Sequence, residues 1–100
     1  MPSFSYSALA EADLYELLEY IAQDNIDAAL RVEEAIERTA QLLADNPEIG
    51  HPVKSRFPHL RAFIVQPYND YLLFFQIEED GIHIQRILHG ARDVSSLLNP

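Results

Sequence analysis

The sequence contains no cysteine and no tryptophan, and only three of its 100 residues are glycine. Without cysteine the chain can form no disulfide and offers no thiolate as a nucleophile or metal ligand. Its longest apolar runs, such as residues 71–75, fall far short of the roughly 20 residues that a membrane helix needs. The first residues lack the basic segment that begins a signal peptide. These absences predict a soluble, cytoplasmic protein that makes no membrane contact and folds on its apolar core.

Motifs that bind nucleotides, metals or reacting substrates are also missing. No stretch matches GxGxxG or a Walker-type loop, so nucleotide phosphates have no recognisable cradle. No serine lies in a GxSxG elbow, which disfavours a serine triad. The histidines show no metal-ligand spacing and no cysteine supports them; they are His51, His59, His83 and His89. We therefore expect no metal and no cofactor.

Basic residues are scarce and unevenly placed. The net charge is −9, and residues 1–50 account for all of it, with two basic and eleven acidic side chains. Residues 51–100 hold five of each sign, and no acid lies between positions 49 and 69, where Lys54, Arg56 and Arg61 occur. Overall acidity predicts poor long-range attraction to nucleic acid. The local basic window leaves two interpretations open, an anion-binding segment and an ordinary solvated loop.

The first half of the sequence has helical periodicity. Residues 4–6 alternate apolar and polar side chains, which predicts a short strand, and Ser7 is a plausible helix N-cap. Apolar residues at 14, 17, 18 and 21 and at 29, 32, 36, 40 and 43 predict two amphipathic helices. Asp24-Asn25 separates them and caps the second, which Asp45-Asn46-Pro47 ends. So short a connection predicts an antiparallel helical hairpin.

The second half changes to the two-residue period of strands. Residues 46–59 contain three prolines and one glycine and predict an extended loop. Strands are predicted over residues 60–65, 71–77 and 82–89, with Asp80-Gly81 as a hairpin turn and residues 71–75 as a central strand covered on both faces. Asp93 is expected to cap a last helical turn. The prediction is a single α+β domain over residues 1–100, of order β-α-α-β-β-β, with the helical hairpin on one face of a small, mainly antiparallel sheet.

Basic side chains near the strand ends are the candidate functional residues. Arg61 begins one strand, Arg86 lies inside the last strand, and His89 and Arg92 lie at its exit. An antiparallel meander brings ends of neighbouring strands to common edges, so we expect Arg61 and Arg92 to converge. Arginine presents a planar fork that suits phosphate, and histidine can transfer protons near neutral pH.

Each candidate also has a structural interpretation. Arg86 is equally well explained as a strand arginine paired with a carboxylate from the acidic helices. His89 is explained by a hydrogen bond that stabilises the turn into Gly90-Ala91. Tyr68 and Tyr71 are interpreted as packing residues rather than as platforms for stacking bases.

Five motifs spread over the chain form a recognisable pattern. They are Asp45-Asn46-Pro47 with Gly50, Leu60-Arg61, Tyr71-Leu72-Leu73-Phe74-Phe75, Asp80-Gly81-Ile82 and, most specific, Arg86-Ile87-Leu88-His89-Gly90-Ala91-Arg92-Asp93. With these motifs the chain resembles the RelE/ParE superfamily of bacterial toxins from type II toxin–antitoxin modules, and it looks closest to the ParE branch. The resemblance spans essentially the whole chain and implies a βααβββ toxin neutralised by a ParD-like antitoxin.

The resemblance implies two kinds of activity. ParE-like members poison DNA gyrase, whereas RelE-like members cleave mRNA on the ribosome with basic residues. For a nuclease, the matching catalytic positions would be Arg61, Arg86 and His89. The tyrosine or histidine that follows the last strand in nuclease members has no counterpart here, which disfavours RNA cleavage. No catalytic residue is therefore assigned, and the predicted target-binding residues are Lys54, Arg56, Arg61, Arg86, His89 and Arg92.

The leading hypothesis is a ParE-like toxin that binds a protein target, DNA gyrase, without being an enzyme. A RelE-like, ribosome-dependent mRNA endoribonuclease is the alternative. The acidity of the chain, together with Gln76 where many relatives place arginine, suggests a third hypothesis, a non-toxic relic that keeps only antitoxin binding. The expected partners are a ParD-like antitoxin and gyrase, with assembly into a higher-order toxin–antitoxin hetero-oligomer.

Overall fold

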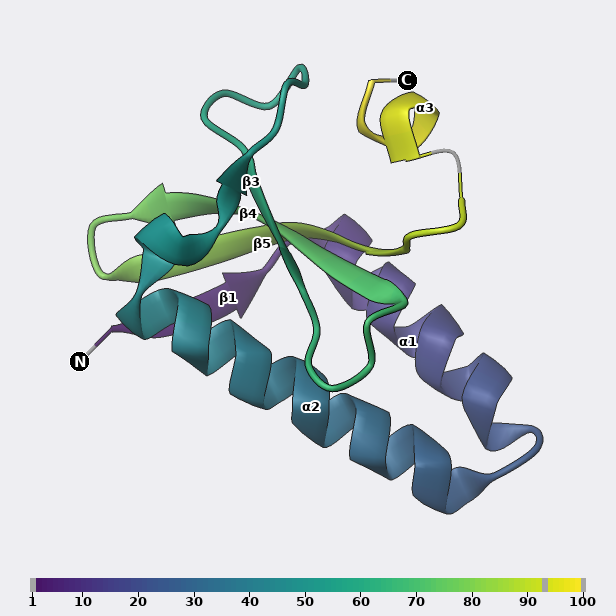
Figure 1. Ribbon diagram of the computed structural model, residues 1–100. Coiled ribbons are helices and arrows are strands. Elements are labelled where there is room, and N and C mark those ends of the chain that lie inside the picture. The colour runs from purple at the N-terminus through teal and green to yellow at the C-terminus, as the bar shows by residue number, and fades with distance from the viewer. Residues whose placement is uncertain (1, 93, 100) are drawn as a thin grey trace.

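In the computed structural model, which describes residues 2–92 and 94–99, a helical hairpin packs against one face of a sheet (Figure 1). The sheet has five strands in the order β1-β5-β4-β3-β2, with β1 parallel to β5 and every other pair antiparallel. The elements are β1 (Ser3–Tyr6), α1 (Ala8–Ala22), α2 (Ile26–Asp45), the 3-10 turn η1 (Pro47–Ile49), β2 (His51–Pro52), β3 (Arg61–Ile64), β4 (Tyr71–Glu78), β5 (Gly81–His89) and α3 (Val94–Leu98). The predicted α+β architecture is confirmed.

The helix boundaries follow the predicted caps. Ser7 accepts a hydrogen bond from the Ala10 N–H at 3.0 Å, and Asn25 accepts one from Ala28 at 3.0 Å. These bonds satisfy backbone N–H groups that the first turn of a helix leaves free. Helix α2 ends at Asp45, before the proline that cannot continue it. In the described part of the chain, no helix is long and apolar enough to cross a membrane.

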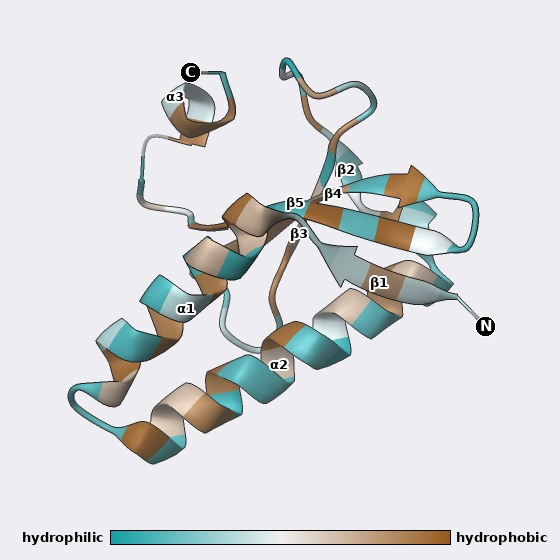
Figure 2. Ribbon diagram, turned by 180° about the vertical axis from the view of Figure 1, so that it is seen from behind, coloured by the Kyte–Doolittle hydropathy of each residue, from teal (hydrophilic) through white to brown (hydrophobic). Residues whose placement is uncertain are grey.

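Two apolar clusters lie on opposite faces of the sheet. The larger one, beneath the hairpin, includes Ile36, Leu73 and Phe75, and the smaller one lies under α3 and the loop before β3 and includes Phe74. Strand β4 therefore contributes to both clusters, which confirms the prediction of a central strand covered on both faces. Hydrophobic and hydrophilic residues alternate along β5 (Figure 2). Tyr68 packs against the larger cluster, as expected.

The prediction of one extended loop over residues 46–59 is wrong in its first half. Pro47 begins the 3-10 turn, a position where its missing N–H is not needed, and β2 then pairs with Arg61 and Ala62. The chain passes so close to β4 that a side chain at Gly50 would collide with the ring of Phe75. The predicted cap Asp93 lies outside the described residues, whereas the helix expected after it is present as α3.

The hydroxyl of Tyr6 is buried and, among the described residues, lacks a hydrogen-bond partner. Burial, aided by the charges of Glu37 and Glu33, raises the pKa of Tyr6 to about 12. We expect Tyr6→Phe to raise the free energy of unfolding at pH 7 by about 1 kcal/mol, because it removes an unsatisfied polar group. Urea denaturation of the two proteins measures this difference.

The same substitution predicts a change at alkaline pH. The folded protein holds the Tyr6 proton more tightly than the unfolded chain, whose ordinary phenol pKa is 10.0. The stability that this proton contributes is complete below pH 10 and is lost as the pH rises through about 12. Tyr6→Phe should therefore lose less stability over this interval. Tyr15→Phe, at a residue that is 70% exposed, is the control and should match the parent; a Tyr6→Phe protein less stable than the parent at pH 7 would contradict the prediction.

Candidate target-binding site

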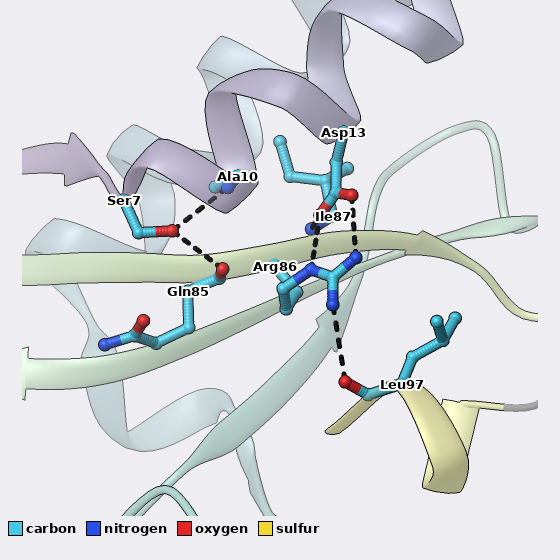
Figure 3. Close-up of polar contacts among 7 residues, drawn as sticks. All are labelled: Ser7, Ala10, Asp13, Gln85, Arg86, Ile87 and Leu97. Carbon is cyan, nitrogen blue, oxygen red and sulfur yellow. Dashed lines mark hydrogen bonds and ion pairs between the residues drawn. The ribbon is translucent and has the colours of Figure 1, made fainter. Parts of the chain in front are cut away.

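On the edge away from β4, the second half of β5 lies beside α1 instead of beside another strand. Strand β1 pairs with β5 only as far as Ile84, so the backbone groups beyond it need other partners. The Ser7 hydroxyl donates to the Gln85 carbonyl at 2.8 Å, and the Asp13 carboxylate accepts from the Ile87 N–H at 3.0 Å (Figure 3). Two side chains of the first helical turns thus replace the missing strand.

Asp13 also holds the guanidinium of Arg86. The two side chains form a bidentate ion pair, with Nε to Oδ2 at 2.8 Å and Nη2 to Oδ1 at 2.9 Å. The remaining nitrogen, Nη1, donates to the Leu97 carbonyl of α3 at 3.3 Å (Figure 3). The hydrogen bond with Asp13 raises the pKa of Arg86 above its ordinary value, although burial alone would lower it. The interpretation of Arg86 as a strand arginine paired with a helix carboxylate is confirmed.

A β-bulge in β5 lies next to this arginine. Phe75 of β4 lies opposite Ile84, and Phe74 lies opposite Arg86, so Gln85 is an extra residue. The bulge lets Ile84 and Ile87 both reach the core beneath the hairpin, although two residues lie between them and strict alternation would place them on opposite faces. The signal in the sequence is the pair of polar residues between these two isoleucines, where strict alternation allows one.

A groove of about 440 Å³ lies beside the ion pair, between α1 and the adjoining ends of β4 and β5. We call it the recognition groove. Its lining consists of Asp13, Glu16, Leu17, Tyr20, Tyr71, Ile87, His89 and Arg92. The rings of Tyr71 and His89 pack edge to face, with their centroids 5.4 Å apart. The predicted packing role of Tyr71 is confirmed, and burial raises the pKa of its phenol.

The exit of β5 is held in a tight turn. The Nδ1 atom of His89 accepts a hydrogen bond from the Ala91 N–H at 3.0 Å, which confirms the turn-stabilising interpretation of His89. The Arg92 N–H donates to the His89 carbonyl at 3.1 Å, and the Gly90 N–H donates to the Asp70 carbonyl at 2.7 Å. These bonds fix the backbone from which the exposed Arg92 side chain extends.

Arg61 lies away from the exit of β5, and the expectation that it converges with Arg92 is wrong. It is opposite Phe75, whereas His89 is opposite Tyr71, which separates the two levels by about 13 Å along β4. Strands β3 and β5 are both antiparallel to β4, so the start of one lies far from the exit of the other. The Arg61 guanidinium instead donates to the Gly50 carbonyl at 2.7 Å.

The other predicted contacts form a separate surface. Lys54 and Arg56 are exposed in the loop before β3, whose Val53 and Phe57 pack on the sheet face away from the hairpin. The Arg56 N–H donates to Asn99 Oδ1 at 2.7 Å, so this loop is tied to the residue that follows α3. Of the six predicted residues, the structure brings His89 and Arg92 into one groove. Arg86 does not line this groove but is paired with Asp13, which does.

The sequence interpretation did not assign Asp13 to the site. It follows Ala10 by three positions and precedes Leu17 by four, so it lies on the buried face of α1. A carboxylate in that stripe needs a partner, which is the signal that could have indicated it. Within residues 2–92 and 94–99, no group of three or more potential ligand side chains could hold a metal ion.

Comparisons with known proteins give a family from the sequence and similar folds from the structure. A profile described as "ParE toxin of type II toxin-antitoxin system, parDE" matches residues 4–94. The chain is 34% identical over 83 residues to "Toxin RelE2" of Caulobacter vibrioides, covering 83% of this chain and 89% of that protein. Its fold is similar to a chain of the chromosomal ParDE system of P. aeruginosa, with a TM-score of 0.70, 22% identity, and coverage of 89% of this chain and 96% of that chain. It is also similar to a chain of the E. coli DinJ-YafQ complex, with a TM-score of 0.61, 18% identity, and coverage of 91% and 96%.

Proposed function

Because the chain belongs to the ParE toxin family of type II toxin–antitoxin systems, we propose that it is a ParE-like toxin that arrests growth by binding DNA gyrase. In this proposal the toxin acts in the cytoplasm as a binding protein and not as an enzyme. A ParD-like antitoxin neutralises it, and the two proteins assemble into a hetero-oligomer.

The dispersal of the candidate nuclease residues carries this proposal. Cleavage of RNA requires cations that converge on one phosphate and an acid or base within hydrogen-bond reach. Here the fork of Arg86 is occupied by Asp13, and Arg61 of β3, about 13 Å from the level of His89, donates to the Gly50 carbonyl. His89 therefore has neither arginine as a free partner, which favours binding over RNA cleavage.

The recognition groove is the proposed contact with the target. It combines two tyrosines with an exposed arginine, and these are the residue types that dominate the energetics of protein interfaces. Tyr71 and His89 are fixed by their mutual packing, and Arg86 acts as a positioning residue that holds Asp13 in the groove lining. Lys54, Arg56 and Arg61 lie outside this groove and form the alternative contact surface.

Expression of the chain alone tests the proposal. We expect growth arrest with a DNA-damage response, inhibition of gyrase supercoiling by the purified protein, and rescue by a ParD-like protein encoded beside it. Normal supercoiling at saturating toxin would exclude gyrase as the target. The similarity to Toxin RelE2 favours the endoribonuclease alternative, which predicts new transcript ends at codon positions. Harmless expression with retained antitoxin binding would identify a non-toxic relic.

A further inference from the structure

The recognition groove differs in charge from the helix that forms one of its sides. Helix α1 carries four acidic and no basic side chains, and the hairpin over residues 8–45 carries ten acidic and two basic ones. In the groove, however, Glu16 on the α1 side is matched by Arg92 on the side that follows β5. The charge of Asp13 is balanced by its ion pair with Arg86. The groove is therefore close to neutral, with a negative side and a positive side.

Both charges on the rim of the groove are available to a ligand. Glu16 and Arg92 are exposed, and among the described residues neither side chain forms an ion pair. The hydrogen bond with Asp13, and then the charges of Asp13 and Glu16, raise the pKa of Arg86, so Glu16 lies within electrostatic range of that guanidinium. The fork of Arg86 is nevertheless occupied by Asp13, which leaves the Glu16 carboxylate free to pair with an incoming basic group.

The centre of the groove is apolar and aromatic. Leu17 of α1 and Ile87 of β5 line it, and the rings of Tyr20, Tyr71 and His89 add aromatic surface. The edge-to-face contact fixes Tyr71 and His89, whereas Tyr20 is 74% exposed. The volume of about 440 Å³ lies within the range of roughly 300–1,000 Å³ that is usual for ligand pockets. Aromatic rings also favour contact with the edge or the offset face of another ring. This centre therefore suits one large apolar side chain, above all an aromatic one.

We propose that the recognition groove binds a segment of the target protein in which one large apolar side chain lies between an acidic and a basic residue. The apolar side chain would lie against Tyr71 and Ile87. The acidic residue would pair with Arg92 and the basic residue with Glu16, which gives the complementary charge on both sides of the anchor. The identification of this partner as the target of the toxin rests on the proposed function; the chemistry of the bound segment does not.

The distribution of charge argues against two other occupants. A strand of nucleic acid carries negative charge along its whole length, so it would pair with Arg92 but would be repelled by Glu16 and by the acidic hairpin. A second copy of the chain would bring a molecule of net charge −9 against α1. A protein segment that carries both signs of charge satisfies both sides of the groove.

Three synthetic peptides test the chemistry of the groove. Each has a central phenylalanine, and its flanks carry one glutamate and one lysine in the mixed peptide, two glutamates in the acidic peptide and two lysines in the basic peptide. Fluorescence anisotropy with the full chain should show at least fivefold tighter binding of the mixed peptide than of either other peptide. The difference should shrink at about 0.5 M salt, where screening is strong. Equal affinities for the three peptides, or no binding of any, would overturn the proposal.

Charge reversals show which residues read the two flanks. Arg92→Glu and Glu16→Arg should each weaken binding of the mixed peptide about tenfold, with Arg92→Glu now preferring the basic peptide and Glu16→Arg the acidic one. The double variant should bind the mixed peptide within about threefold of the parent, because the peptide can lie in the reverse direction. A double variant that binds no better than the single variants would contradict the proposal.

Matched controls make the same changes of charge outside the groove. Arg31→Glu and Glu19→Lys alter exposed residues of the hairpin that do not line the recognition groove, so both should bind the mixed peptide within about twofold of the parent. Thermal denaturation checks that all variants remain folded. Losses in the controls as large as those in Arg92→Glu and Glu16→Arg would show a nonspecific effect of charge and overturn the proposal.

Supercoiling assays separate this inference from the proposed function. Where the chain inhibits gyrase, excess mixed peptide should relieve the inhibition and the acidic peptide should not. Undiminished inhibition at saturating mixed peptide would overturn the groove as the target-binding site and leave the gyrase proposal standing. Binding of the mixed peptide by a chain that leaves supercoiling normal would support the chemistry of the groove and overturn gyrase as the target.

Two further measurements identify a different occupant. A Glu16→Arg protein that still arrests growth but is no longer rescued by the antitoxin would assign the groove to the antitoxin. Self-association in analytical ultracentrifugation that the mixed peptide abolishes would assign it to a second copy of the chain. Either result would overturn the proposal. We expect instead that Glu16→Arg weakens the arrest, and that the parent shows no self-association that depends on the peptide.

Discussion

Replacing Asp13 by alanine is expected to lower the free energy of unfolding by about 3–5 kcal/mol, because it breaks a buried ion pair. The Asp13 and Arg86 side chains are only 10% and 13% exposed, so water cannot take over the lost interactions. The substitution leaves a buried guanidinium without its counter-charge and removes the acceptor of the Ile87 N–H. Urea denaturation, with the midpoint and slope compared with those of the parent, measures the loss.

Three further variants show whether the ion pair is the cause. Glu16→Ala removes an exposed carboxylate one turn along the same helix and should change stability by less than about 0.5 kcal/mol. Arg86→Met should lower the free energy of unfolding as much as Asp13→Ala does, since it leaves the Asp13 carboxylate buried without a counter-charge. Asp13→Leu combined with Arg86→Met should recover much of the loss, because no unpaired charge then remains. A cost for Asp13→Ala no greater than that for Glu16→Ala would contradict the prediction.

Local features of the fold are predictable because each rests on neighbouring residues. Ser7 and Asn25 satisfy the first N–H groups of their own helices. The turn Glu79-Asp80, one position before the predicted Asp80-Gly81, joins two strands that are adjacent in the sequence. The same holds for the apolar stripes, whose spacing alone identifies the buried face of each helix. The order and type of the elements therefore agree with the structure, apart from the turn and short strand before residue 53.

The site is less predictable because it depends on where distant elements end. Asp13 meets Arg86 only because β1 stops at Tyr6 and leaves the edge of β5 to α1. The local periodicity of these segments does not predict where β1 ends. The error about Arg61 has a different origin, which is strand direction. Strands β3 and β5 lie on either side of β4 and run in the same direction, so the start of β3 lies far from the exit of β5. Counting directions through the meander would have placed Arg61 correctly.

Arg92→Glu is expected to reduce inhibition of the target by about 10- to 100-fold while leaving the fold intact. Its side chain is exposed, and its backbone is fixed by the bond from its N–H to the His89 carbonyl, so the substitution changes charge more than structure. Arginines at the centre of an interface commonly contribute 2 kcal/mol or more, which corresponds to about 30-fold in affinity. Titration of the variant in a supercoiling assay, with denaturation as a check on folding, measures the effect.

Lys54→Glu is the matched control, because it makes the same change of charge at an exposed residue on the opposite face of the sheet. If Arg92 acted only through long-range attraction to the target, both variants would lose about the same inhibition, and this loss would shrink with added salt. A contact in the recognition groove predicts instead a loss confined to Arg92→Glu that persists at high salt. Arg92→Lys should fall between the parent and Arg92→Glu, since it keeps the charge and loses the planar fork. A larger loss in Lys54→Glu than in Arg92→Glu would move the target-binding surface from the groove to the loop before β3.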